Sequence, residues 1–254
     1  SMCLEKCNES REYDMNHRYR GKAIIINNKK FNNGDERTGT DTDKDSLKER
    51  FEELEFSVDE PHSDLTRAKM LEVLERDHSQ SDCFMCAILS HGNEGVVSGY
   101  DGPIEIEKLL APFKGDKCSS LVGKPKIFFI QVITFFFVFN LFSFLLFTLN
   151  QITLKYGSCL VIIEMLYYYY YLLLYIFLSG YGSWQHSSDG SWFVQAISEV
   201  FQEHGKTSHL LDMMTMVNQK VALDFQTDDE REKKQMPCIE SMLTKKVYFK
   251  PKSR

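Results

Sequence analysis

The sequence predicts an α/β fold, with a mostly parallel sheet that carries helices on both faces. Residues 24–26, 83–89 and 127–130 form continuous apolar runs, as is typical of strands buried on both sides. Segments with helical spacing separate these runs. Strands that alternate with helices favour a parallel sheet covered on both faces. At 254 residues the chain can bury one large core or two small ones.

The first half of the chain supplies most of the predicted elements. Leu47, Phe51 and Leu54 repeat at helical spacing behind an acidic start, which suits a helix N-terminus. Asp101 and Gly102 lie between two short apolar segments, which indicates a hairpin turn. We expect strands at 22–28, 56–58, 83–89 and 126–131, helices at 41–56 and from 64 to about 74, and a hairpin at 95–106.

The last part of the chain predicts two helices and a closing strand, at 190–205, 208–225 and 238–249. Gly205 would end the first of these helices. Ligand sites in parallel sheets lie beyond the carboxyl ends of the strands. His91 follows one predicted buried strand and Gln131 ends another. We therefore expect both residues at the functional edge of the sheet.

Composition narrows the class of protein. A net charge of −6 provides no basic field for nucleic acid. Seven cysteines are an odd number without framework spacing, which fits a reducing, cytoplasmic compartment better than a disulfide scaffold. Residues 1–20 are charged and lack the apolar core of a signal peptide, so secretion is not expected.

Residues 132–179 differ from the rest of the chain. This segment of 48 residues holds two charged side chains, Lys155 and Glu164, yet it contains 8 of the 19 Phe and 7 of the 12 Tyr. Such a stretch is an aggregation hazard in water wherever it is exposed. Low soluble yield is therefore expected for the chain as written.

Three interpretations of this segment remain open. It could form two membrane spans, 132–149 and 159–178, because each is close to the roughly 20 apolar residues that cross a bilayer. It has no Ala, no Pro and one Gly, although membrane helices use small residues for packing. It could be translated noncoding sequence, because Phe, Tyr, Leu, Ile and Asn come largely from A/T-rich codons. It could also be an evolved loop; the composition favours the noncoding origin.

Short motifs on both sides of this segment resemble the caspase family of cysteine endopeptidases. They occur in the family's order from about residue 13 to residue 249, and the short N-terminus resembles executioner members. The motifs are residues 24–28, 37–41, 89–92, 115–118, 123–131, 183–184, 189–193 and 237–239. The resemblance implies a caspase-like α/β fold.

The resemblance assigns catalytic roles to two residues. His91 would carry the proton of the attacking thiol and of the leaving amine. The backbone N–H of Gly92 would donate to the oxyanion. The family's Gln-Ala-Cys signature places the nucleophile after an upstream histidine. Ile133, 42 positions after His91, occupies that cysteine position here.

The resemblance also assigns substrate-binding roles. Arg37 and Gln131 would line the pocket for the substrate aspartate, since a guanidinium gives a carboxylate two charge-assisted bonds. Ser183 and Trp184 would lie along the bound peptide, and Trp192 would lie in an outer subsite.

The departures from the family are as informative as the matches. Gln185 stands where the family has a second substrate-binding arginine. The cleavable linker between subunits and the first strand of the small subunit are missing. Loss of the nucleophile in a comparable peptidase costs on the order of a millionfold in turnover. We therefore predict an inactive chain of a family that cleaves after aspartate in programmed cell death, or alternatively a catalytically dead homologue that regulates partners by binding.

The resemblance implies an N-terminal tail (1–17), a large-subunit-like region (18–131), the anomalous hydrophobic segment (132–179) and a small-subunit-like region (180–254). It also implies protein substrates with aspartate at the cleavage site and a homodimer, but no metal or organic cofactor.

The remaining cysteines have simple explanations. Cys83 and Cys86 have C-x-x-C spacing, but they lie in a predicted buried strand without a second pair, which favours core packing over metal or redox chemistry. Neither Cys118 nor Cys159 lies at the strand end beside His91. We therefore do not expect either cysteine to replace the nucleophile.

Overall fold

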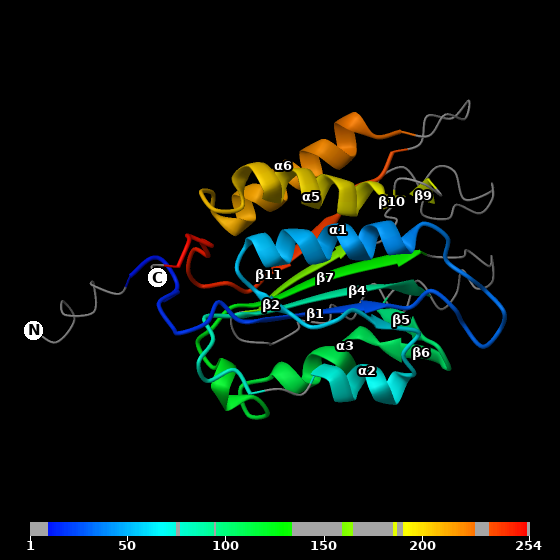
Figure 1. The fold of residues 1–254 in the computed structure, drawn as a ribbon, viewed down its shortest axis with the longest axis horizontal. Helices are drawn as coiled ribbons and strands as arrows, with labels where there is room; N and C mark the ends of the chain where they lie inside the picture. The colour runs from blue at the N-terminus through cyan, green and yellow to red at the C-terminus, as the bar shows by residue number, and fades with distance from the viewer. Residues whose placement is uncertain are drawn as a thin grey trace, which may run out of the picture.

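The computed structural model describes residues 10–74, 77–93, 95–133, 159–164, 185–186, 190–226 and 234–252. Its centre is a mostly parallel sheet with helices on both faces (Figure 1). The predicted fold class is therefore confirmed.

The strands of the sheet follow the order β11-β8-β7-β4-β1-β2. All neighbours in this order are parallel except β11, which runs antiparallel to β8 at one edge. A short strand, β3, also pairs with β1. The strands are β1 (Lys22–Asn27), β2 (Ser57–Val58), β3 (His62–Ser63), β4 (Phe84–Asn93), β7 (Lys126–Ile133), β8 (Cys159–Glu164) and β11 (Cys238–Ser241).

Helices divide between the two faces of the sheet (Figure 1). On one face lie α1 (Thr40–Glu53), α5 (Trp192–His204) and α6 (Leu210–Asp224), and on the other lie α2 (Arg67–Leu74) and α3 (Ile106–Leu110). Two short 3-10 turns, Ala111–Phe113 and Ser119–Leu121, follow α3.

Each face of the sheet has its own hydrophobic core. Phe129 packs into the core beneath α1, α5 and α6, whereas its neighbour Phe128 packs into the core beneath α2 and α3. Successive side chains of a strand point to opposite faces. Because both faces are buried, β1, β4 and β7 are apolar at successive positions rather than alternately.

A hairpin extends the carboxyl end of β4. It consists of β5 (Val96–Gly99) and β6 (Gly102–Glu105), which confirms the predicted hairpin, with the turn at residues 100–101, one position before the one expected. β5 pairs antiparallel with β4 through Gly92↔Val97 and Asn93↔Val96. This pairing explains why β4 continues through His91 and Gly92 instead of ending before them.

Two predicted elements have different bounds in the structure. The helix expected from residue 64 begins at Arg67, because Asp64 has a φ of 53° and its carboxylate accepts hydrogen bonds from the backbone N–H groups of Lys29 and Lys30 at 2.8 and 2.7 Å. The closing strand expected at 238–249 ends at Ser241. The chain after it bonds to residues 11–13 and to the start of α6.

The hydrophobic segment contributes one strand to the sheet. β8, which lies inside the hydrophobic segment, pairs in parallel with β7 and antiparallel with β11. The continuous apolar sequence of residues 160–163 suits a strand between two others. Residues 159–164 therefore form a strand, not the start of the second proposed membrane span. Most of both proposed spans lies outside the described residues, and no helix within the described ranges is long and apolar enough to cross a membrane.

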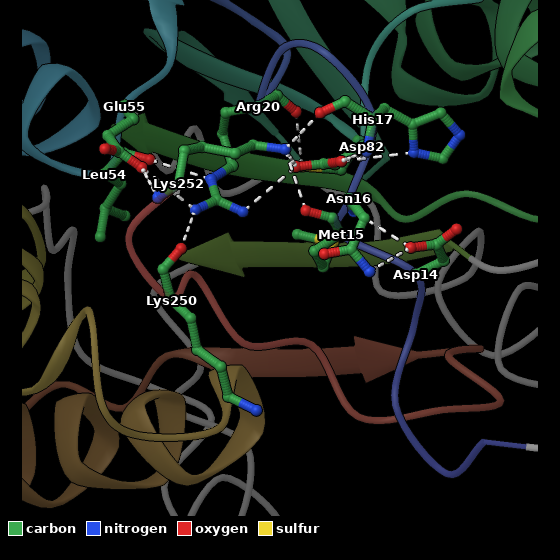
Figure 2. A network of polar contacts seen from close by, with 11 residues as sticks. Asp14, Met15, Asn16, His17, Arg20, Leu54, Glu55, Asp82, Lys250 and Lys252 are labelled. Atoms are coloured by element: carbon green, nitrogen blue, oxygen red, sulfur yellow. Dashed lines mark hydrogen bonds and ion pairs between the residues drawn. The ribbon is translucent and has the colours of Figure 1, made fainter. Parts of the chain in front are cut away.

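A buried ion network joins the two ends of the described chain at the amino ends of the strands (Figure 2). The side chains of Arg20 and Asp82 are 1% and 0% exposed and lie 3.2 Å apart, from Nη1 to Oδ2. Lys252 Nζ lies 2.5 Å from the same carboxylate. Arg20 also donates to the carbonyl oxygens of Leu54, at 3.1 Å, and of Lys250. This network lies at the end of the sheet away from His91 and holds residues 250–252 against the N-terminal region.

Candidate active site

The carboxyl ends of β4 and β7 bring the predicted site residues together. In the register of these parallel strands, His91 is the partner of Ile133, and Leu89 is the partner of Gln131. Neighbouring strands lie about 4.8 Å apart. The position that holds cysteine in the family signature is therefore next to the histidine in space, although it holds isoleucine.

His91 is held at the edge of an open depression. Its side chain is largely buried, and its ring lies 4.8 Å from the ring of Phe31 between centroids, tilted by 36°. The depression has a volume of about 270 Å³ and lies between residues 31–35 and the hairpin, with Tyr100 and Gly92 also in its lining. The ring of His91 therefore lies where the end of β4 meets this depression.

Gly92 lies in a space that admits no side chain. A Cβ at this position would lie 2.3 Å from the carbonyl oxygen of Val96 and 2.8 Å from Cγ1 of Val132. Glycine is the residue that allows backbone segments to approach this closely. The backbone of residue 92 is therefore fixed between β5 and β7 beside His91.

Arg37 and Gln131 form one buried polar contact. Arg37 Nη2 donates to Gln131 Oε1 at 2.6 Å, and both residues are 1% exposed. Arg37 Nη1 donates to Thr40 Oγ1 at 2.8 Å and to the carbonyl oxygen of Asn28 at 3.3 Å. Nε2 of Gln131 is buried and has no hydrogen-bond partner among the described residues. A buried donor without a partner costs free energy, and a ligand carboxylate would satisfy it beside the guanidinium.

The loop before α1 is shaped to hold Arg37 in this place. The backbone N–H of Arg37 donates to the carbonyl oxygen of Lys29 at 2.8 Å. Thr40 Oγ1 donates to Asn27 Oδ1 at 2.6 Å, which ties the start of α1 to the end of β1. Gly39 turns the chain into α1 with a φ of 75°, a left-handed conformation that glycine adopts without strain. This local structure explains the Arg-Thr-Gly-Thr sequence.

The remaining predicted site residues are described only in part. Trp192 is the first residue of α5, is 3% exposed and stacks on Phe225 with ring centroids 5.6 Å apart. Ser183 and Trp184 lie outside the described residues. The backbone of Gln185 belongs to β9 (Gln185–His186), which pairs with β10 (Gly190–Ser191) directly before α5.

Sequence reasoning missed a buried carboxylate near this site. Asp43, in the first turn of α1, is 1% exposed and accepts the backbone N–H of Ser191 at 2.7 Å. Burial raises its pKa to about 6, although the Ser191 N–H and the charge of Arg37 oppose this rise. Asp43 lies one helical turn before Leu47 and two turns before Arg50 and Phe51. That spacing was the available signal that Asp43 faces inward.

The cysteines outside the site pack as expected. Cys83 and Cys86 are both 0% exposed and belong to the cores on opposite faces of the sheet. Burial raises the pKa of both thiols, so neither is a reactive thiolate. Cys159 is the register partner of Lys126, and Cys118 lies 3.5 Å from Ser120. Cys159 begins β8 beside the amino end of β7, and Cys118 precedes the 3-10 turn that leads to β7. Neither lies at the carboxyl end of β7, so neither can replace the nucleophile beside His91.

Within the described ranges, no group of three or more His, Cys, Asp or Glu side chains could hold a metal ion.

A mostly parallel sheet with helices on both faces and a histidine at its carboxyl edge is consistent with the caspase fold. The family model described as "Caspase domain" matches residues 20–134 and 169–248. The chain therefore belongs to the caspase family, a family of apoptosis-related cysteine proteases.

Individual caspases are similar over nearly the whole chain. Caspase-7 of Gallus gallus is 40% identical over 257 residues, which cover 94% of this chain and 80% of that protein. Caspase-3 of Bos taurus is 38% identical over 262 residues, which cover 93% of this chain and 87% of that protein. Caspase-3 of Mus musculus is also 38% identical, with 93% and 86% covered.

Proposed function

We propose that this chain has the scaffold of an executioner-type caspase that cleaves proteins after aspartate in programmed cell death. We also propose that the chain as written is inactive, because Ile133 stands in the place of the nucleophile. The observation that carries the proposal is the register of β4 and β7, in which His91 and Ile133 are partners. The buried contact between Arg37 and Gln131 supports the choice of substrate.

The chemistry of the site follows from these positions. A thiol at position 133 would give its proton to the imidazole of His91, and the thiolate would attack the carbonyl carbon of the substrate. The backbone N–H of Gly92 would stabilise the oxyanion, and His91 would return the proton to the leaving amine. An isoleucine side chain has no lone pair with which to form the first bond. The loss of turnover is on the order of a millionfold by comparison with other peptidases that lack their nucleophile.

Recognition of aspartate does not need the nucleophile. The guanidinium of Arg37 and the free amide N–H of Gln131 would both donate to a substrate carboxylate. Ser183, Trp184 and Trp192 would contact the rest of the peptide. Gln185 supplies no charge where the family has arginine, so we expect weaker binding than in an intact member of the family.

A second function, that of a catalytically dead homologue that binds partners and regulates them, is favoured by the missing nucleophile and by Gln185 in place of a substrate-binding arginine. The residues that match the family argue against a long-standing loss of function; they are His91, Gly92, Arg37 and Gln131. The two proposals differ in what repair of the site would achieve. If the chain is an enzyme with one defective segment, replacement of that segment should restore turnover. If the chain is a pseudo-enzyme that lost catalysis long ago, the same replacement should leave it inactive.

The assembly is proposed from family resemblance. We propose a large-subunit-like region at 18–131 and a small-subunit-like region at 180–254, with residues 132–179 in place of the linker between subunits. β11 lies at an edge of the sheet, where unpaired backbone groups can accept a strand from a second copy. A homodimer of this kind would have twofold symmetry. The free thiols of Cys83, Cys86, Cys118 and Cys238 suit the reducing cytoplasm.

The test of function compares three forms of the chain with a fluorogenic peptide that ends in aspartate. These are the chain as written, Ile133→Cys, and a form in which the family's usual segment replaces residues 132–179. We expect no turnover from the first form and turnover from the third. A restored segment that leaves the protein inactive while it still binds the peptide would count against the enzyme and favour the regulator.

The origin of the hydrophobic segment has its own test, which is to sequence the mature transcript across the codons for residues 131–180. A transcript that encodes Gln-Ala-Cys-Arg-Gly and a cleavable linker would support an active protease whose chain is misassembled here. A transcript that encodes residues 132–179 as written would support the pseudo-enzyme.

A further inference from the structure

Asp43 connects two parts of the chain that both belong to the candidate site. It lies in the first turn of α1, three residues after Thr40, whose hydroxyl accepts a hydrogen bond from Arg37 Nη1 at 2.8 Å. It also contacts Ser191, which is 148 residues away along the sequence. The first turn of α1 therefore contacts both the guanidinium of Arg37 and the backbone at the start of the C-terminal region.

The contact with the C-terminal region is close. The backbone N–H of Ser191 donates to Asp43 Oδ1 at 2.7 Å. Gly190 has a φ of +84°, and a Cβ at this position would lie 2.3 Å from the same carboxylate oxygen. Only glycine satisfies both the left-handed backbone and the short distance. The carboxylate is therefore fitted against the backbone of residues 190–191.

This backbone leads directly into α5. Ser191 is the N-cap of the helix, and its hydroxyl accepts the backbone N–H of Val194 at 3.4 Å. Gln195 Nε2 donates to the carbonyl oxygen of Gly190 at 3.1 Å. Trp192 is the first residue of the helix, so its place relative to α1 depends on what holds residues 190–191.

We propose that Asp43 is a positioning residue, whose buried carboxylate docks β10 and the start of α5 onto α1 and thereby sets the place of Trp192 relative to α1. The inference rests on the proposed function to the extent that Trp192 lies in a peptide subsite. Asp43 itself touches neither the substrate nor the reacting atoms in this account.

The charge on Asp43 gives the dock a pH dependence. The groups that face the carboxylate include the guanidinium of Arg37 from the preceding loop, and the backbone N–H and hydroxyl of Ser191 from the start of α5. Burial raises the pKa of Asp43 to about 6. Above this pH the bond from Ser191 is charge-assisted, and below it the bond is neutral and roughly half as strong. The surroundings of Trp192 should therefore change around pH 6.

Trp192 fluorescence tests the proposal without substrate. The chain has two tryptophans, so Trp184→Phe leaves Trp192 as the only indole reporter. In this background we expect the emission maximum to follow a sigmoid in pH with a midpoint near 6. Asp43→Asn should remove the sigmoid, and Asp43→Ala should shift the emission to longer wavelength at pH 7.5. Asp45→Asn is the matched control, because the side chain of Asp45 is 71% exposed on the same helix.

Two results would overturn the proposal. One is an Asp43→Asn variant that keeps the sigmoid of its parent. The other is an Asp43→Ala variant whose emission at pH 7.5 matches that of its parent while circular dichroism reports the same helix content. Asp43→Asn retains an oxygen that can accept the Ser191 N–H, so the test does not depend on the folding of Asp43→Ala alone.

Peptide binding separates this inference from the proposed function. The probe is a fluorescein-labelled tetrapeptide that ends in aspartate, and its anisotropy is measured at pH 7.5. We expect Asp43→Ala to weaken binding about tenfold and Asp43→Asn to bind like the parent, because a misplaced subsite loses about one hydrogen bond's worth of affinity. Equal peptide affinity in the parent chain, Asp43→Ala and Asp43→Asn would contradict the positioning role of Asp43. A parent chain that does not bind the peptide would contradict the aspartate pocket, while the fluorescence titration would still decide the role of Asp43.

Discussion

Ile133 is the partner of His91 in the register of two adjacent parallel strands, β7 and β4. The backbone therefore places position 133 beside His91. Gly92 leaves no space for a side chain between β5 and β7, so the same backbone also fixes the next residue along β4. The site has the framework of a cysteine protease and lacks the sulfur atom.

Replacement of Arg37 tests the aspartate pocket. Arg37→Ala removes the guanidinium that donates to Gln131 at 2.6 Å and would donate to a substrate carboxylate. We expect binding of the labelled aspartyl peptide to weaken by about 10- to 100-fold, the range for a lost charge-assisted hydrogen bond. Anisotropy measures this effect. The control is a peptide that ends in asparagine, which should bind weakly to both forms; if both peptides bind equally to the unaltered chain, the pocket does not recognise aspartate.

The buried charge of Asp43 predicts a pH dependence of stability. Its pKa rises from 3.8 to about 6 on folding, so the folded state holds the proton more tightly than the unfolded state. The resulting stabilisation is complete below pH 4 and is lost as the pH rises through 6. The difference amounts to about 3 kcal/mol. Urea unfolding between pH 4 and 8 should show this decline in the unaltered chain.

Asp43→Asn is the matched variant for this experiment. Because an amide does not titrate, the variant should lack the decline and exceed the unaltered chain in stability near pH 7.5. Asp45→Asn should decline like the unaltered chain. Parallel curves for the unaltered chain and Asp43→Asn would mean that the carboxyl group is not the cause.

A methyl group at position 92 is expected to destabilise the fold, whereas one at position 115 is not. Gly92→Ala would place a methyl group 2.3 Å from the carbonyl oxygen of Val96, so β4 or β5 must move. We expect a loss of about 1–3 kcal/mol in the free energy of unfolding, as for other overpacked sites. Gly115→Ala is the control, since its nearest neighbour is Val122 Cγ2 at 3.6 Å. Equal stability of the two variants would show that the hairpin yields freely at Gly92.

The network between Arg20 and Asp82 predicts strong destabilisation when one partner is removed. Asp82→Ala removes the fully buried carboxylate from the guanidinium of Arg20 and leaves it the 40% exposed carboxylate of Glu55, at 3.4 Å (Figure 2). Such a change costs about 3–5 kcal/mol, and chemical denaturation measures it. Asp59→Ala breaks the more exposed pair with Lys22, at 2.8 Å, and should cost at most about 1 kcal/mol. A small effect at Asp82 would mean that Arg20 finds other acceptors.

The main elements of the sheet could be predicted because their sequences are distinctive. β1, β4 and β7 are buried on both faces, so their apolar runs differ from the helices between them. β8 was not predicted, although Gly157, Ser158 and Glu164 bound it, because it lies inside a much longer stretch of apolar composition that was interpreted as a whole. The closing strand was predicted too long because Val247 and Phe249 are apolar. Both side chains are indeed buried, at 0% and 1% exposure. They pack into the core without belonging to the sheet.

The site was predictable only in part. His91 and Gln131 follow from the rule that ligands bind beyond the carboxyl ends of parallel strands. The contact between Arg37 and Gln131 joins residues 94 apart in sequence, and no local pattern indicates it. Asp43 was interpreted as part of an acidic helix start, because its partner Ser191 comes from the far end of the chain.

The most direct test of the central claim is the reactivity of a thiol at position 133. The measurement is the alkylation rate of Ile133→Cys by iodoacetamide between pH 5 and 10, followed by mass spectrometry of the peptide that contains this position. The account predicts that the protonated imidazole of His91 lowers the pKa of the introduced thiol well below the usual value of about 8.5. The added change His91→Ala should return the profile to that value. If Ile133→Cys and the double variant with His91→Ala gave the same dependence of alkylation rate on pH, His91 and position 133 would not act as a pair.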